Sequence, residues 1–190
     1  MTDSISAQTV LDFWFQGAPD TWRIDPWFKK SDDFDAAIRT RFATAVQAAQ
    51  DGVLDGWAAT PEGALALLLL LDQFGRNIHR GSFLAFAGDA HARRIARSAI
   101  DAGAETKLTP VQRVFLYLPF EHSEALADQD LSIRLFESLP PAEWRASVVD
   151  YAHRHQDVIR EFGRFPHRNA ALGRDSTAAE QAWLDAGGGF

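Results

Sequence analysis

The run of apolar residues from Gly63 to Leu71 constrains the fold more than any other feature of the sequence. It reads GALALLLLL, and its nine residues include no polar side chain. Thr60 and Pro61 precede it, a residue pair typical of a helix start, where the hydroxyl caps the first turn and proline occupies the first helical position. Leucines on every face predict a helix buried on all sides. Because a bilayer span takes about 20 apolar residues, the run predicts a core helix rather than a membrane helix.

Further helical patterns cover most of the chain. Phe34, Ile38, Phe42 and Val46 recur at four-residue steps after Ser31, which predicts a long amphipathic helix that ends near residue 52. Alternating apolar runs bounded by hairpin turns, the signature of strands, are absent from the sequence. The other predicted helices are residues 9–15 with Thr9 as N-cap, 89–103, 110–119 stopped by Pro119, 124–138, 141–163 ended by Pro166, and one opened by the capping box of Thr177 and Glu180. We therefore predict an all-α fold of about seven to nine helices, with residues 1–190 as one domain.

Composition narrows the class of protein. A hydrophobic content of 46% with 12% aromatic residues suffices for a core. The absence of cysteine excludes disulfides, thiolate metal sites and a cysteine nucleophile. A net charge of −7 argues against a nucleic-acid partner. The amino terminus lacks a basic segment followed by an apolar run, so we expect a cytoplasmic protein with no membrane partner.

The first polar stretch, LDQFGRNIHR, follows the leucine run directly. Asp72 and Arg76 are four residues apart and can pair on a helix. Gly75 is expected to break or bend the helix, which would leave Arg76, Asn77, His79 and Arg80 on a loop. The alternative is a helix end finished by basic residues that suit its dipole.

The second polar stretch, PFEHSE, is expected to form a loop after Pro119. Ser123 can cap the helix that follows, which is a structural role. Local rules give Glu121 and His122 no such role. A carboxylate beside an imidazole serves acid–base chemistry or binds a divalent metal.

The third polar stretch reverses the local charge of an acidic protein. Between Arg160 and Arg174, four arginines and His167 oppose a single acid. Pro166 stiffens the turn, and Phe162 and Phe165 are expected to anchor in the core. The residues that this turn presents are Arg164, His167, Arg168 and Asn169. Upstream, His155 is expected to face inward on its helix, where a histidine is more often a satisfied core residue than a catalyst.

The first two polar stretches share a weak internal repeat, in which a Thr-Pro pair precedes each stretch by the same number of residues. Thr60-Pro61 lies twelve residues before Asp72-Gln73. Thr109-Pro110 lies twelve residues before Glu121-His122. Stacked helical hairpins would explain this spacing, and coincidence is the alternative.

Together these motifs resemble the bacterial DUF924 family of uncharacterised proteins. LLLLLDQFGRNIHRG, LPFEHSE, FGRFPHRNAALGR and STAAEQAWL occur in the family's order, and the resemblance runs from Val10 to the carboxyl end. It implies an all-helical fold similar to tetratricopeptide-like arrays of helical hairpins, and no established activity. His79 stands where an aromatic residue is expected, and Ala125 where an acidic residue is common. The family's motif residues carry over as Asp72, Gln73, Arg76, Asn77, Arg80, Glu121, His122, Ser123, Glu124, Asp128, Gln129, His155 and residues 164–169.

These residues predict a polar pocket for a small anionic ligand, a carboxylate or a phosphate, with hydrolysis or another acid–base reaction as the chemistry. The candidate catalytic residues are Glu121, His122, His155 and Asp72. The candidate ligand-binding residues are Gln73, Arg76, Asn77, Arg80, Arg164, His167, Arg168 and Asn169. No cofactor fingerprint occurs in the sequence, so neither cofactor nor metal is predicted; a metal held by Glu121, His122 and Asp72 is a minor alternative.

Two other interpretations use the same residues. In the first, a tetratricopeptide-like module binds an acidic peptide or protein terminus through its arginines. In the second, the charged motifs form a buried ion-pair network that only stabilises the fold. The sequence leaves oligomeric state and ligand identity open.

Overall fold

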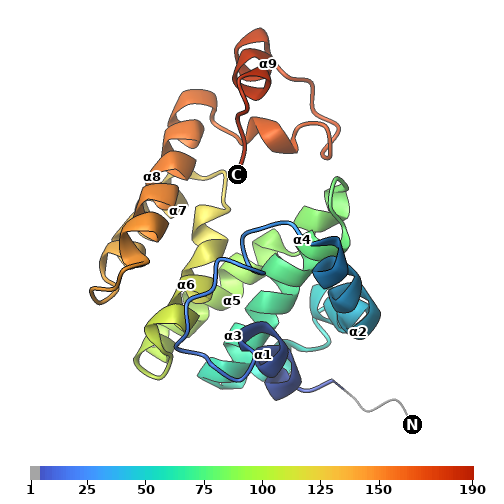
Figure 1. Ribbon diagram of the computed structural model, residues 1–190, viewed down its shortest axis with the longest axis vertical. Coiled ribbons are helices and arrows are strands. Elements are labelled where there is room, and N and C mark those ends of the chain that lie inside the picture. Colours follow the sequence, from blue (N-terminus) through green and yellow to red (C-terminus); the bar gives the residue numbers. More distant parts are fainter. Residues whose placement is uncertain (1–4) are drawn as a thin grey trace. The chain divides into compact units, whose positions relative to one another are not determined.

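A computed structural model describes residues 5–190 of the chain, and every regular element in this part is helical (Figure 1). The predicted all-α fold is therefore confirmed. Within the described residues, no helix is both long enough and apolar enough to cross a membrane. The α-helices are α1 (Ala7–Phe15), α2 (Asp32–Gln50), α3 (Pro61–Leu68), α4 (Gly75–Ile78), α5 (Asp89–Asp101), α6 (Pro110–Glu121), α7 (Leu126–Glu137), α8 (Arg145–Phe162) and α9 (Ala178–Asp185).

The chain divides into two compact units. Unit 1 consists of Met1–Arg80 and Leu84–Pro119, and unit 2 consists of Gly81–Phe83 and Phe120–Phe190. The prediction of a single domain over residues 1–190 stays a prediction.

The leucine-rich helix forms the centre of unit 1, as its sequence predicts. The Thr60 hydroxyl accepts a hydrogen bond from the Gly63 amide at 3.1 Å, and Pro61 follows as the first helical residue. All side chains from Ala64 to Leu71 are buried. Helices α1 and α5 contact α3, and α2 contacts residues Leu69–Phe74, which follow α3 directly. Neighbours on several sides explain why every face of this helix is apolar.

The helix does not break at Gly75, so that prediction is wrong. A π-helical turn, Leu69–Phe74, follows α3, and α4 continues directly from it. Gly75 keeps right-handed helical angles, φ −55° and ψ −46°. Glycine in a helix costs about 1 kcal/mol but does not forbid it, and burial of the flanking Phe74 and Ile78 outweighs that cost. Arg76 and Asn77 therefore lie on a helix rather than on a loop, whereas His79 and Arg80 lie in the turn that follows it, outside a helix as predicted.

Helix α1 begins earlier than predicted. The Ser6 hydroxyl, rather than Thr9, is the N-cap, and it accepts a hydrogen bond from the Thr9 amide at 3.1 Å. The helix starts three residues earlier than predicted because Ser6 lies upstream of Thr9 and serine is at least as good an N-cap as threonine. On this helix Trp14 is fully buried against Trp27 and Phe74, with ring centroids 6.2 and 5.4 Å away.

Helix α6 does not stop at Pro119. It runs from Pro110 to Glu121 with Pro119 inside it, so the predicted end is wrong by two residues. A proline inside a helix removes one backbone hydrogen bond. Leu118 and Phe120 on either side are buried, and this burial offsets the loss. Glu121 is consequently the last residue of a rigid helix, rather than part of a loop.

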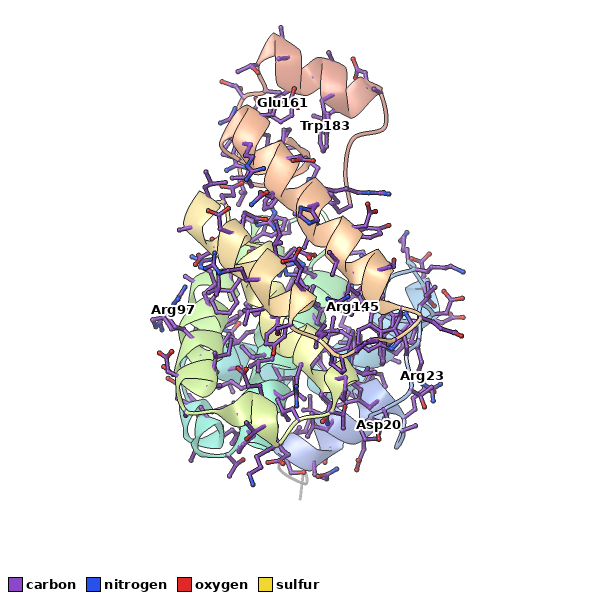
Figure 2. All side chains as sticks on the ribbon, turned by 90° about the vertical axis from the view of Figure 1, so that its left-hand side faces the viewer. Asp20, Arg23, Arg97, Arg145, Glu161 and Trp183 are labelled. Atoms are coloured by element: carbon purple, nitrogen blue, oxygen red, sulfur yellow. The ribbon has the colours of Figure 1, made fainter. Side chains whose placement is uncertain are left out.

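Unit 2 is organised by α7 and α8, which pack against each other. Both helices start later than predicted. Helix α8 ends at Phe162 because Gly163 takes the left-handed conformation at φ +70°, three residues before Pro166. Trp183 projects from α9 near the end of α8 (Figure 2), and its ring centroid lies 5.8 Å from that of Phe162. The capping box of Thr177 and Glu180 that opens α9 is confirmed.

Candidate functional site

The predicted site residues fall into two groups, one in each unit. Unit 1 holds Asp72, Gln73, Arg76, Asn77 and Arg80. Unit 2 holds Glu121, His122, His155, Arg164, His167, Arg168 and Asn169.

In unit 1, Arg76 is bound by two carboxylates of the chain itself. Its Nη1 lies 3.1 Å from Asp72 Oδ1, which confirms the four-residue pairing. Its guanidinium also donates to both oxygens of Asp89, at 2.9 and 3.1 Å. Burial lowers the pKa of Arg76, but the negative charges of Asp72 and Asp89 raise it and prevail. Sequence patterns missed Asp89, whose only signal was its place at the start of α5.

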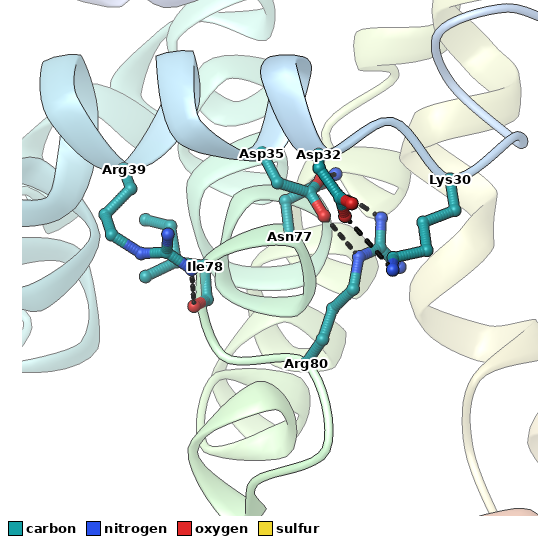
Figure 3. A pocket seen from close by; sticks show the side chains of 7 residues that line it. All are labelled: Lys30, Asp32, Asp35, Arg39, Asn77, Ile78 and Arg80. Atoms are coloured by element: carbon teal, nitrogen blue, oxygen red, sulfur yellow. Dashed lines mark hydrogen bonds and ion pairs between the residues drawn. The ribbon is translucent and has the colours of Figure 1, made fainter.

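Gln73 Nε2 donates to Asp72 Oδ2 at 2.6 Å. Asn77 and Arg80 are held in place by Asp35 and line a pocket of about 350 Å³ (Figure 3). Asn77 Nδ2 donates to Asp35 Oδ1 at 2.6 Å, and Arg80 Nη2 donates to the same oxygen at 3.1 Å. Burial raises the pKa of Asp35, yet these two hydrogen bonds and the Arg80 charge bring it below its usual value. Arg39 donates to the Ile78 carbonyl oxygen at 2.8 Å on the same pocket wall. Most of the charge in this pocket is thus matched within the protein.

In unit 2, three residues lie together: Glu121 at the end of α6, His122 directly after it and His155 on α8. Each residue offers one carboxylate oxygen or ring nitrogen, and these atoms all lie within 4.8 Å of one another. Glu121 Oε1 lies 3.5 Å from His155 Nδ1, and both side chains are buried, with 5% and 6% of their surface exposed. His122 is half-buried. The helical position of Glu121, which the sequence did not predict, directs its carboxylate toward α8.

The ring of His155 is held on three sides. Nδ1 lies 2.8 Å from the carbonyl oxygen of Tyr151, one helical turn earlier. Since only a protonated ring nitrogen can donate to a carbonyl, this contact leaves the lone pair on Nε2. Phe190 stacks on the ring face with centroids 3.6 Å apart, and Phe165 meets it edge-on at 5.6 Å. The contact with Tyr151 could have been inferred from the four-residue spacing; that with Phe190 had no sequence signal.

The surroundings of His155 disfavour a positive charge. Burial lowers the pKa of His155 well below its usual value, and the charge of His122 lowers it further. The charges of Arg168 and His167 act in the same direction, whereas the hydrogen bond to Tyr151 opposes them. The buried imidazole is accordingly neutral at neutral pH.

The arginines of the third stretch have different roles. Arg164 donates to both oxygens of Glu180, with Nη2 2.8 Å from Oε2, so it fastens the turn to α9. Arg174 forms a similar fork with Glu124, at 2.8 and 2.9 Å. Arg168 lies over the Phe165 ring, 4.5 Å from its centroid, on the ring that also meets His155. Arg168 therefore brings positive charge close to the histidine cluster.

Asn169 and His167 complete this turn. Asn169 Nδ2 donates to Ser176 Oγ at 3.1 Å and lies 3.4 Å from Glu180 Oε2. His167 packs its ring 5.5 Å from that of Phe165 and 5.6 Å from that of Phe190. The turn thus places His167 beside the aromatic rings around His155, while Asn169 faces the partner of Arg164.

Glu180→Gln is expected to flatten the acid side of the stability curve. Hydrogen bonds from Arg164 and the Thr177 amide lower the pKa of Glu180 from 4.5 to about 2. The folded state therefore binds this proton less readily than the unfolded state, so the contribution is complete above about pH 4.5 and is lost as pH falls toward 2. Urea unfolding between pH 2 and 6 measures the effect. The control is Glu161→Gln, which removes an exposed carboxylate; an equal change in both variants would contradict the assignment.

The comparisons with known proteins agree with the architecture and name no activity. No curated protein matches the chain. A solved structure of a protein of unknown function from Agrobacterium tumefaciens, ATU0120, is 39% identical with a TM-score of 0.85, and the match covers 95% of this chain and 97% of that one. The model of the family described as bacterial protein of unknown function (DUF924) matches residues 10–188. The chain therefore belongs to the DUF924 family.

Proposed function

We propose that the protein is an enzyme that hydrolyses a small anionic substrate, or acts on it by another acid–base reaction, at the cluster of Glu121, His122 and His155. The observation that carries the proposal is the buried Glu121 carboxylate 3.5 Å from the buried His155 imidazole, with a second imidazole beside them. Buried ionisable groups in such proximity are enriched at functional sites.

The cluster contains the groups that hydrolysis requires. The Nδ1 of His155 is held by the Tyr151 carbonyl, so the Nε2 lone pair has a fixed direction. The carboxylate of Glu121 is the second group able to act on a water molecule. Both sit on helices, and this rigidity favours catalysis because reacting groups must be held in place.

Positive charge beside the cluster supports an anionic substrate. The charges of Arg168 and His167 are close enough to His155 to influence its protonation. Arginine is suited to carboxylates and phosphates because its planar fork donates two parallel hydrogen bonds. Half-buried His122 is the member of the cluster that solvent reaches most readily, and we place the entry of the substrate on its side.

The alternative, a tetratricopeptide-like module for an acidic peptide, has less support. Such a module needs arginines with charge to spare along a groove. Arg76 is engaged by Asp72 and Asp89, and Arg164 by Glu180. These pairs fit the stabilising network better than a peptide-binding surface.

The binding of inorganic phosphate and of acetate to the full chain tests the substrate class. We expect isothermal titration calorimetry to detect binding of at least one of them, weakened about tenfold by Arg168→Gln, because a hydrogen bond to a charged group contributes about 1.5–3 kcal/mol. Arg160→Gln is the control, since Arg160 is an exposed arginine of α8 whose nearest carboxylate, Asp130, is 3.9 Å away. Equal weakening in both variants, or no binding of either anion, would contradict an anionic substrate.

Glu121→Gln is expected to lower hydrolysis of small phosphate or carboxylate esters about 100-fold, the lower end of what a general acid or base contributes. Chromogenic nitrophenyl esters provide the readout, with circular dichroism to confirm that the variant is folded. The control is Glu161→Gln on the exposed face of α8. Undiminished hydrolysis in Glu121→Gln would assign any activity to another part of the chain.

A further inference from the structure

The Glu121, His122 and His155 cluster also fits a metal ion, and we propose that it binds one divalent transition-metal ion of the Zn²⁺ type. The inference rests on the proposed function in locating the reactive site, and it adds the cofactor of that site. The sequence alone predicts no metal. The spatial meeting of two imidazoles and one carboxylate is what points to the ion.

The donor set is the one that zinc uses in catalytic sites. Two histidines and one glutamate provide three protein ligands and leave a fourth position for water or substrate. Imidazole suits Zn²⁺ and its neighbours in the transition series, whereas Mg²⁺ and Ca²⁺ prefer all-oxygen sites. With two nitrogen donors against one carboxylate, the cluster favours a transition metal over an alkaline-earth ion.

The separations are close to those that coordination needs. Zinc–ligand distances of about 2.0–2.2 Å in a tetrahedral site place ligand atoms roughly 3.4 Å apart. The three donor atoms here lie within 4.8 Å of one another. His122 follows the end of α6 directly and is half-buried, so it is the least enclosed of the three ligands.

The surroundings of His155 match those of a metal-bound histidine. Histidine ligands usually donate their second ring N–H to a carbonyl or carboxylate, which fixes the ring orientation and raises the basicity of the ligating nitrogen. Tyr151 provides such a carbonyl at 2.8 Å. The rings of Phe190 and Phe165 pack against the imidazole, at centroid distances of 3.6 and 5.6 Å. An apolar cover of this kind controls solvent access at metal sites.

A bound metal would act on an anionic substrate in the same direction as the basic residues beside the cluster. A divalent ion with one carboxylate ligand keeps a net charge of about +1, which favours an anion in the open position. Arg168 and His167 both pack on the Phe165 ring, which also contacts His155, and would hold the rest of that anion. When bound, the ion supplies a water molecule of lowered pKa, which is the nucleophile that hydrolysis needs at neutral pH.

Zinc binding to the full chain tests the inference directly. After treatment with chelator and its removal, titration with ZnCl₂ by isothermal calorimetry is expected to show one ion per chain. His122→Ala and Glu121→Gln should each weaken binding at least about tenfold, since even indirect disturbance of a metal site costs 10–100-fold. His122 is half-buried, so its variant is expected to remain folded. The control is His153→Ala, an exposed histidine of α8 whose side chain is 50% exposed.

Two outcomes would overturn the inference: no zinc binding by the wild-type chain, or binding that His153→Ala weakens as much as His122→Ala. Phosphate binding by the chelator-treated chain separates this proposal from the previous one. If Arg168-dependent phosphate binding persists while zinc binding is absent, the metal is disproved and the anion site stands. If zinc binds through His122 but no anion binds with or without it, the metal site stands and the proposed anionic substrate is wrong.

Discussion

Arg76→Met is expected to lower the free energy of unfolding by about 3–5 kcal/mol, the typical loss when one partner of a buried ion pair is removed. The substitution keeps most of the apolar stem but leaves two carboxylates without their shared cation. Asp72 is 2% exposed, so water cannot solvate its charge well. Asp89, at 12%, is only slightly more accessible. Urea denaturation of the variant at neutral pH measures the loss.

A matched control exists on the surface of unit 2. Arg154 and Asp150 are also an arginine–aspartate pair four residues apart, 2.7 Å from each other, but their side chains are 61% and 55% exposed. Arg154→Met is therefore expected to lose no more than about 1 kcal/mol. A loss for Arg76→Met no larger than this would show that Asp72 and Asp89 do not depend on Arg76. The stability loss of Arg76→Lys should lie between those of Arg76→Met and Arg154→Met. Lysine keeps the positive charge, but a single ammonium cannot form the paired hydrogen bonds with Asp89.

Phe165→Ala is expected to cost about 3–5 kcal/mol of unfolding free energy, as large-to-small substitutions of buried phenylalanine do. Phe165 is fully buried and packs with Val158 and Ile159 in the core cluster of unit 2. Its ring also supports the edge of His155 and the guanidinium of Arg168. The cavity left by alanine would remove both supports at once. Urea denaturation gives the stability loss, and the ZnCl₂ titration described above gives the loss in site geometry.

Phe83→Ala is the control, because Phe83 belongs to the same unit and is 61% exposed. Surface substitutions of this kind usually change stability by less than about 0.5 kcal/mol. Phe165→Leu refills part of the cavity and should lose less than Phe165→Ala. Equal stability of Phe165→Ala and Phe83→Ala would contradict the claim that Phe165 packs in the core of unit 2.

The arginines show how far residue type alone predicts a role. Arg76 and Arg164 were expected to clamp an anion, and each is engaged by carboxylates of its own unit. An arginine has the same donors whether its partner is a ligand or an aspartate elsewhere in the chain, so the sequence leaves these two possibilities equal. Arg168, unlike Arg164, is buried, and it lies close to the histidine cluster.

Local rules predicted the fold well wherever a short-range signal decided the outcome. The Thr-Pro starts of α3 and α6 and the capping box of α9 occur at the predicted residues, because capping depends on atoms within one helical turn. The apolar run Gly63–Leu71 is buried throughout, as nine residues without a polar face require. The same signals are unreliable where burial competes with propensity, and Gly75 and Pro119 both lie inside continuous helices for that reason.

The sequence by itself determined the helical class, most helix starts, the inward face of His155 and the residue types available for chemistry. Only the tertiary structure decided which of those residues meet. Glu121 ends α6 and His155 lies on α8, and their approach depends on how residues far apart in the sequence pack within unit 2. The partners Asp89 and Phe190 were likewise invisible in the sequence. The physical reason is that capping and periodicity act over a few residues, whereas a binding site is a contact between segments whose separation is set by packing of the whole core.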